Sequence, residues 1–160
     1  MSSSVVFFLT TELIDLYQDV TEPGGIMGDS GYNIKFPEDV IIPPMGANAQ
    51  SFAINLRVCV RCQIDNINSA YQLIPRSRIA DHPIIMANSP GLIDKNYMGP
   101  LIVKVYNMSL TPREFKRGTS LFQIVAPNAQ PSIVYIVNRD HELFSQITIR
   151  GENGFGSTGA

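Results

Sequence analysis

Several kinds of residue and segment are scarce in this chain. It has no tryptophan, only two cysteines and no long run of apolar residues. Its apolar segments, such as residues 5–9, are far shorter than the roughly 20 residues that a membrane-spanning helix needs. The N-terminal segment carries neither a basic stretch nor a small-residue cleavage site, so we expect no signal peptide. These absences predict an intracellular protein, cytoplasmic or nuclear and not secreted, with no membrane partner.

Charge of either sign is scarce too. Charged residues make up 16% of the 160 residues, hydrophobic residues make up 44%, and the formal net charge is −2. This balance is typical of one globular domain and gives no reason to expect a nucleic-acid partner. To bind a polyanionic ligand, such a chain needs positive charge gathered at one place.

The two cysteines, Cys59 and Cys62, have the spacing of a redox or zinc motif. They lie in an alternating apolar segment, residues 53–64, in which side chains three positions apart point to opposite faces of a strand. Two thiols on opposite faces cannot share a metal ion. We therefore interpret them as reduced structural cysteines of an intracellular protein.

Short strand-like segments separated by proline, glycine and asparagine dominate the chain. They are residues 39–42, 53–64, 84–87, 101–107, 121–125, 133–137 and 147–149. Their number and spacing predict an all-β fold, a jelly-roll β-barrel with one short helix or two. The first helix is expected over residues 13–20, with Thr10 or Thr11 as its N-cap.

The last residues differ in composition from the rest. Residues 150–160 are mostly glycine and polar residues with almost nothing to bury, so we divide the chain into a β-barrel domain, 1–149, and a glycine-rich C-terminal arm, 150–160. Such a segment is either a flexible terminus or an arm that orders on a ligand. Arg150, the backbone near Gly156 and the hydroxyls of Ser157 and Thr158 suit a phosphate group, and Phe155 suits stacking on a base.

A second group of polar residues surrounds a turn at residues 75–80. Ser77 is a good helix N-cap, and Arg76 and Arg78 flank it. A helix N-terminus with two arginines is a candidate anion site, and a solvated basic turn explains the same pattern. Further along, Gln123 shares a strand face with Leu121 and therefore needs a polar partner, either structural or from a ligand.

A third group lies in residues 88–99. Gly91 allows the backbone to approach a planar ligand, Asp94 is a candidate base, and Tyr97 is a candidate stacking wall. A polar hairpin in which Asp94 is a turn residue accounts for this segment equally.

Taken together, five segments resemble the signature motifs of the trimeric dUTPase family, in order and in spacing. They are residues 29–34, 75–80, 88–99, 117–125 and 150–159. The resemblance covers nearly the whole chain, and the third and fifth segments are its most specific parts.

The resemblance implies an enzyme that hydrolyses dUTP to dUMP and pyrophosphate with Mg²⁺ on the triphosphate, which keeps uracil out of DNA and supplies dUMP. It implies a homotrimer with three sites at subunit contacts. Asp94 would activate the water that attacks the α-phosphorus. The backbone near Gly91 and Ile93, with Asn88 nearby, would read the uracil, and Tyr97 would lie under the deoxyribose.

The resemblance also assigns the residues around the triphosphate. Arg76, Ser77, Arg78 and Gln123 would hold it, and the arm would close over it through Arg150, Phe155, Gly156, Ser157 and Thr158.

Four positions depart from the family's pattern. Asn33 stands where the family usually has an aspartate that steadies the waters on Mg²⁺, so we expect weaker metal binding, with Asp29 as a second metal candidate. Arg78 replaces a small residue, and Met98 and Pro100 replace an arginine and a glutamate. Two alternatives stay open: a dCTP deaminase of the same fold, against which the arm argues, and a catalytically weakened relative that binds or regulates another protein.

Overall fold

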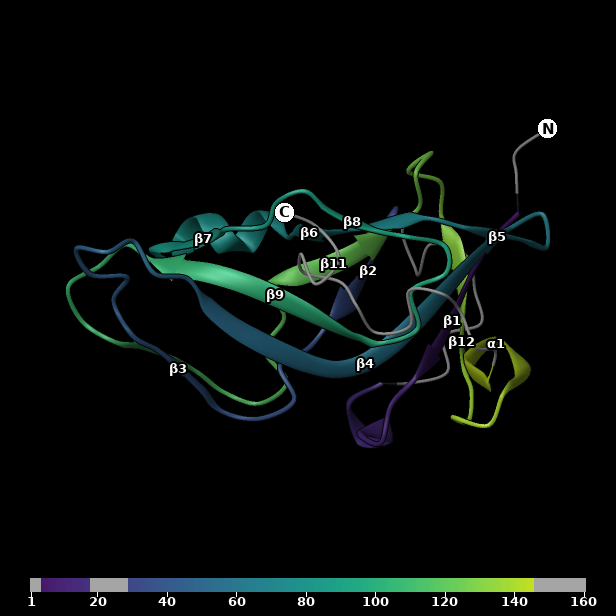
Figure 1. Ribbon diagram of the computed structural model, residues 1–160, viewed down its shortest axis with the longest axis horizontal. Helices are drawn as coiled ribbons and strands as arrows, with labels where there is room; N and C mark the ends of the chain where they lie inside the picture. The colour runs from purple at the N-terminus through teal and green to yellow at the C-terminus, as the bar shows by residue number, and fades with distance from the viewer. Residues whose placement is uncertain (1–3, 18–28, 146–160) are drawn as a thin grey trace.

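Strands make up most of the computed structural model of this chain, which describes residues 4–17 and 29–145 (Figure 1). The strands are β1 (Val5–Thr10), β2 (Gly31–Ile34), β3 (Val40–Ile42), β4 (Phe52–Ile64), β5 (Ile67–Ser69), β6 (Tyr71–Pro75), β7 (Ile84–Met86), β8 (Gly91–Ile93), β9 (Pro100–Asn107), β10 (Arg113–Phe115), β11 (Phe122–Val125) and β12 (Ser132–Ile136). Two short 3₁₀ helices, η1 (Ile14–Leu16) and η2 (Ser77–Asp81), and one α-helix, α1 (Glu142–Ser145), complete it.

The strands form three sheets. The largest has the order β12-β1-β4-β9-β7, with β5 paired to β4, and a four-stranded sheet has the order β2-β11-β6-β8. A two-stranded sheet pairs β10 with β3. Strands β1 and β12 run parallel, and the other pairs are antiparallel. The predicted all-β fold of jelly-roll type is confirmed.

One hydrophobic core joins the two larger sheets. Its members alternate along the strands with exposed or half-buried residues, as in β9, where every second residue from Leu101 is buried. Phe7, Val58 and Val103 come from the large sheet, and Leu73 and Phe122 come from the four-stranded sheet. Burying one face of each sheet against the other is what holds the sheets together.

The helix predicted over residues 13–20 is wrong in type and length within the described residues. Only the three residues of η1 are helical, and Tyr17 is already extended, with φ −127° and ψ 132°. The Thr11 hydroxyl accepts a hydrogen bond from the Leu13 N–H at 3.1 Å and donates to the Arg57 carbonyl at 2.8 Å, which makes a local turn instead of an N-cap. Tyr17 is drawn into the core, where its Oη accepts a hydrogen bond from the Lys35 N–H.

Strand β4 is longer and less regular than simple alternation predicts. A register shift lies between Asn55 and Cys59 where β4 pairs with β9, and every residue from Val58 to Cys62 is buried. Both cysteines are free and buried. Burial in apolar surroundings raises the pKa of the Cys62 thiol to about 12.

The raised pKa of Cys62 predicts a loss of stability at alkaline pH. The ordinary thiol pKa is 9.0. Because the folded state disfavours the thiolate, the stabilisation is complete below pH 9 and is lost as the pH rises toward about 12. We expect the melting temperature to fall above pH 9 less steeply in Cys62→Ala than in the natural sequence, each being referred to its own value at pH 7. Parallel curves would show that Cys62 does not contribute to this pH dependence.

No helix among residues 4–17 and 29–145 is long and apolar enough to cross a membrane.

Candidate active site

The structure gathers most of the predicted site residues into two pockets that share no lining residue. The first, which we term the β8 pocket, is lined by Asn88, Pro90, Gly91, Leu92, Ile93, Asp94, Tyr97, Pro100, Leu101 and Ile102. The second, the β11 pocket, is lined by Asp29, Ser30, Gly31, Asn33, Gln72, Ile74, Arg76, Ser77, Gln123, Val125, Ala126, Pro127 and Ala129. The predicted arm residues Arg150, Phe155, Gly156, Ser157 and Thr158 lie outside the described residues.

The β8 pocket has the size of one small ring. Its volume is about 170 Å³. A protein cavity of about 150 Å³ accommodates benzene, so this pocket suits a six-membered ring better than a fused purine. Its apolar walls include Leu101 and Ile102 from β9, whose part in the site the sequence did not reveal because it depends on where β9 passes relative to β8.

Strand β8 offers backbone groups to a ligand because it is an edge strand. It pairs with β6 on one side only, with Gly91 opposite Leu73 and Ile93 opposite Tyr71. Residues 91 and 93 are two positions apart, so their N–H and C=O groups point to the same side of the strand. A side chain on Gly91 would not fit, since a Cβ there would lie 2.9 Å from the Leu73 carbonyl oxygen.

Two side chains in the β8 pocket are held in fixed orientations. Asn88 Oδ1 accepts a hydrogen bond from the Lys104 N–H at 3.0 Å, so the amide presents its Nδ2 donors to a ligand. Tyr97 is 8% exposed, and its hydroxyl donates to the Pro100 carbonyl at 2.7 Å. The pocket therefore has one directed donor and one rigid aromatic wall.

Asp94 is the carboxylate of the β8 pocket. Its backbone carbonyl accepts a hydrogen bond from the Tyr97 N–H at 3.0 Å, which makes residues 94–97 a turn. Asp94 is half-buried and lines the pocket. The turn interpretation and the site interpretation of this residue are thus compatible, since the turn places the carboxylate beside the ring-sized pocket.

The β11 pocket is wider, about 550 Å³, and more polar. Asn33 of β2 lies directly opposite Gln123 of β11 in the antiparallel pairing. Directly opposite residues point to the same face of a sheet, so the two amides are neighbours. The Gln123 Nε2 donates to the Pro75 carbonyl at 3.4 Å, which is one structural partner of the kind the sequence required.

Gly31 determines where the Gln123 side chain lies. A Cβ built on Gly31 would stand 1.9 Å from Gln123 Oε1, a distance that no side chain tolerates. Gly31 is two residues from Asn33, so Gln123 reaches diagonally across the strand pair to cover it. The sequence did not indicate this contact, because it follows from the register of β2 against β11.

Arg76 is held on the segment that precedes β11. Its backbone N–H donates to the Leu121 carbonyl at 2.8 Å, and its Nη1 donates to the Ser120 carbonyl at 2.9 Å. The guanidinium has further N–H donors, which suit an anion in the pocket that Arg76 lines.

The turn after Arg76 differs from the prediction. Arg76, not Ser77, occupies the N-cap position of η2, with φ −79° and ψ 157°, and no side chain caps the turn. The cause is the pairing of β6 with β11, which keeps the backbone extended through Pro75, with Arg76 bonded to Leu121. Ser77 still lines the β11 pocket, whereas Arg78 is exposed and lines neither pocket.

The β11 pocket has oxygen donors that suit a magnesium ion. Asp29 supplies a carboxylate, and Asn33 supplies an amide. Mg²⁺ in proteins commonly takes one or two carboxylates, several waters and the phosphate oxygens of a substrate. Within residues 4–17 and 29–145, no group of three or more histidine, cysteine, aspartate or glutamate side chains is placed to hold a metal. The donor set fits an ion that arrives on a phosphorylated ligand.

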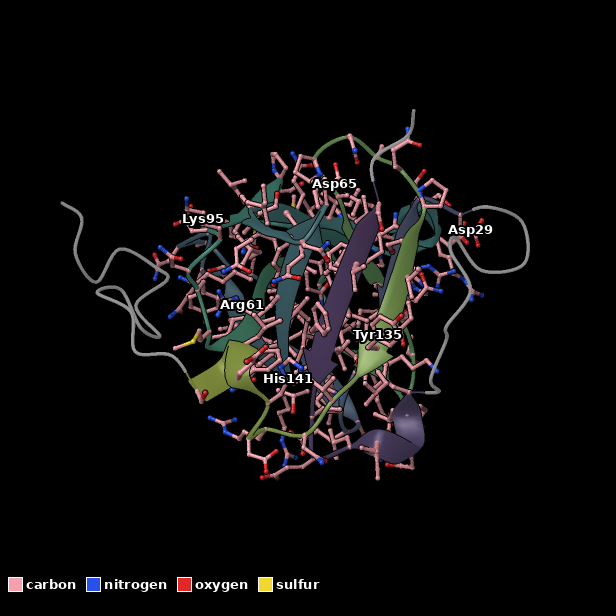
Figure 2. The ribbon with its side chains drawn as sticks, turned by 90° about the vertical axis from the view of Figure 1, so that its right-hand side faces the viewer. Asp29, Arg61, Asp65, Lys95, Tyr135 and His141 are labelled. Atoms are coloured by element: carbon pink, nitrogen blue, oxygen red, sulfur yellow. The ribbon has the colours of Figure 1, made fainter. Side chains whose placement is uncertain are left out.

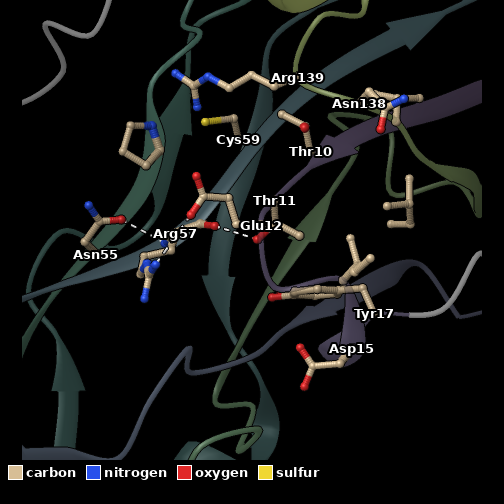
Figure 3. Close-up of a pocket in the computed structure, with 14 residues that line it drawn as sticks. Thr10, Thr11, Glu12, Asp15, Tyr17, Asn55, Arg57, Cys59, Asn138 and Arg139 are labelled. Atoms are coloured by element: carbon tan, nitrogen blue, oxygen red, sulfur yellow. Dashed lines mark hydrogen bonds and ion pairs between the residues drawn. The ribbon is translucent and has the colours of Figure 1, made fainter.

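A third and larger pocket, about 1050 Å³, lies between the end of β1, η1 and the middle of β4 (Figure 3). None of the predicted site residues lines it, and it meets the β8 pocket at Pro100. Arg57 there has φ 57° and is held by Asn55 Oδ1, which accepts a hydrogen bond from the Arg57 N–H at 2.8 Å. The charges around it are mixed, with Arg57 Nη2 3.8 Å from Glu12 Oε2.

The chain is similar to known proteins over most of its length. A family model of dUTPase matches residues 23–159. The deoxyuridine 5'-triphosphate nucleotidohydrolase of Paramecium bursaria Chlorella virus 1 is 33% identical over 146 residues, which cover 90% of this chain and 94% of that protein. The protein of the same name from Wolbachia pipientis subsp. Culex pipiens (strain wPip) is 42% identical over 89 residues, 55% of this chain and 56% of that protein.

A solved structure has a similar fold. The native dUTPase of EIAV has a TM-score of 0.54 with this chain and is 17% identical to it, with 74% of this chain and 85% of that chain covered.

Proposed function

The chain belongs to the dUTPase family, and from that premise we propose that it hydrolyses dUTP to dUMP and pyrophosphate. The observation that carries the proposal is the β8 pocket, which is ring-sized, open to backbone groups of an edge strand and lined by Asp94. The uracil occupies this pocket, and the triphosphate lies along Arg76, Ser77 and Gln123 of the β11 pocket. The two free cysteines fit a reducing, intracellular compartment.

Asp94 acts as the general base. Its carboxylate takes a proton from a water molecule, and the water oxygen forms a bond to the α-phosphorus. The bond between that phosphorus and the oxygen bridging to the β-phosphorus breaks, and pyrophosphate leaves with the electron pair. A well-placed base contributes about 10²–10⁴-fold to such a step.

The charge of the triphosphate must be balanced before a nucleophile can approach. Arg76 supplies one fixed positive charge, and Arg150 of the arm supplies another. Mg²⁺, when bound, supplies further charge neutralisation on the phosphate oxygens. Asp29 and, through waters, Asn33 would hold the ion, and the missing carboxylate at position 33 lowers its affinity.

The base is selected by fixed donors and by size. The Nδ2 of Asn88 is oriented as a donor because its Oδ1 is engaged by Lys104. A donor matches a carbonyl oxygen, which uracil carries where cytosine carries an amino group. A base that leaves this buried group unpaired is strongly disfavoured. The ring of Tyr97, fixed by its bond to Pro100, leaves no space for a 2′-hydroxyl under the sugar.

Turnover in ¹⁸O-labelled water tests the chemistry. The proposal predicts dUMP and pyrophosphate in equal amounts, with the label in the phosphate of dUMP. Label in pyrophosphate would mean that water attacks the β-phosphorus, and the placing of Asp94 beside the α-phosphorus would then be wrong.

We also propose that the complete site forms between subunits of a homotrimer. The two pockets share no lining residue, and Leu92, at the rim of the β8 pocket, is 65% exposed, which fits a surface that a second subunit covers. In this arrangement one subunit supplies the β8 pocket, a second supplies the β11 pocket, and the arm closes over both.

Mixing inactive variants tests this arrangement. Asp94→Asn damages the β8 pocket, and Gln123→Ala damages the β11 pocket. If the pockets of one site come from different chains, trimers reassembled from equal amounts of the two variants recover about a quarter of the natural activity. If both pockets of a site belong to one chain, mixing recovers none.

Gly31→Ala tests the role of Gly31 at the triphosphate. The new Cβ collides with Gln123 Oε1, so the amide must leave the position that faces Asn33. We expect kcat/KM for dUTP to fall about tenfold, the effect of one lost hydrogen bond to a charged group. In a Gln123→Ala background the same substitution should change little further, and an equal loss in both backgrounds would contradict the explanation.

A further inference from the structure

Arg61 is a buried charge that core stability does not explain. It lies in β4 and is 2% exposed. Its Nη1 donates to the Leu143 backbone carbonyl at 2.6 Å, while its Nε and Nη2 have no hydrogen-bond partner in the part of the chain that the structure describes. A buried guanidinium with unsatisfied nitrogens destabilises a core, and an apolar side chain of similar volume is often as stable or more stable there.

The one hydrogen bond of Arg61 holds the end of α1. Leu143 lies in this helix, and its carbonyl is among the last four, which have no partner within a helix. A cation at this end satisfies the carbonyl and interacts favourably with the helix dipole. Helix α1 is the last element described before the chain continues into the arm.

The other contacts of this region lie at the beginning of α1. The His141 ring is 5.4 Å from the Phe8 ring, and its Nδ1 accepts a hydrogen bond from the Leu143 N–H at 3.2 Å. Phe8 in turn lies opposite Arg61 in the pairing of β1 with β4. Arg61 and His141 thus both lie at the helix, on the same region of the large sheet (Figure 2). His141 fixes where the helix starts, and Arg61 fixes where it ends.

We propose that Arg61 is a positioning residue for the C-terminal arm. By binding the Leu143 carbonyl, it fixes the direction in which the chain leaves α1 and so reduces the conformational entropy that is lost when the arm closes on the triphosphate. This inference rests on the proposed function, in which residues 150–160 close the site.

Arg61→Met tests the proposal, because it keeps the volume and removes the link. We expect the melting temperature to stay within about 4 °C of the natural protein. We expect kcat/KM for dUTP to fall about tenfold, mainly through kcat, because substrate binds before the arm closes. Hydrogen exchange of the Phe144 amide, which bonds to the His141 carbonyl, should become faster.

The same substitution in a chain that lacks residues 150–160 separates positioning from a general structural role. The affinity for the non-hydrolysable α,β-imido analogue of dUTP is measured in both backgrounds. Arg61→Met should weaken binding in the full chain and leave it unchanged in the shortened chain. An equal loss in both backgrounds, or none in the full chain while the deletion itself is severe, overturns the role of Arg61. Full activity after the deletion would instead overturn the proposed function of the arm.

Two matched variants complete the test. Arg57→Met changes an arginine four positions earlier in β4 whose side chain is 47% exposed, and it should change neither the melting temperature nor kcat/KM. Arg61→Lys keeps the charge and one donor toward Leu143, and it should recover part of the lost activity. If Arg61→Met does not fold, Arg61→Lys decides alone: natural activity in both backgrounds, or an equal loss in both, overturns the proposal.

Discussion

Asp94→Asn is expected to bind dUTP with nearly the natural affinity and to lose most of its turnover. The amide keeps the shape of the carboxylate, so the turn closed by the Tyr97 N–H and the Asp94 carbonyl is preserved. It cannot take a proton from the attacking water, and kcat should fall about 10²–10⁴-fold. Single-turnover rates and the affinity for the α,β-imido analogue separate the two effects.

Asp65→Asn is the matched control for this substitution. Asp65 accepts a hydrogen bond from the Ser4 N–H in an exposed turn and lines neither the β8 pocket nor the β11 pocket. It should behave as the natural protein does. Natural turnover in Asp94→Asn would remove Asp94 from the role of base and leave it as a turn residue only.

Deleting residues 150–160 is expected to leave a folded protein with little activity. The hydrophobic core is complete within the described residues, so the melting temperature should change by only a few degrees. The deletion removes Arg150 and the hydroxyls of Ser157 and Thr158, and it exposes the bound triphosphate to water. A loss of at least about 10²-fold in kcat/KM is expected, comparable with the loss of a donor to the transition state.

A chain in which residues 150–160 are replaced by glycine and serine in equal number is the control for length. It should be as inactive as the deletion, because the arm acts through its arginine, its aromatic ring and its hydroxyls. Activity close to that of the natural protein in either variant would show that these residues are an ordinary terminus.

Local patterns in the sequence predicted the strands well where packing is simple. Alternation along β4 and β9 depends on residues that are close in sequence, and both strands lie within a residue of the predicted positions. The segment at residues 13–20 failed because the hydroxyl of Thr11 bonds to Arg57, 46 positions away, and helical spacing does not reveal such a partner.

The candidate site was predictable residue by residue but not in its arrangement. The types and spacing of Asp94, Tyr97 and Gln123 identified them as candidates. Their division between two pockets depends on the order β2-β11-β6-β8, which no local pattern fixes. The same holds for Gly31, whose importance comes from lying under Gln123, and for Arg61, which alternation places on a strand face without indicating its burial.

The central claim is tested most directly by pyrophosphate release with Mg²⁺ from dUTP, beside dCTP, dTTP and UTP, with ammonia assayed in parallel. The account predicts release from dUTP alone and no ammonia, which would establish the reaction, the reading of uracil and the exclusion of the 2′-hydroxyl together. Ammonia from dCTP would identify a deaminase of this fold. Binding of dUTP without release from any of the four would contradict the account and identify a binding protein built on this scaffold.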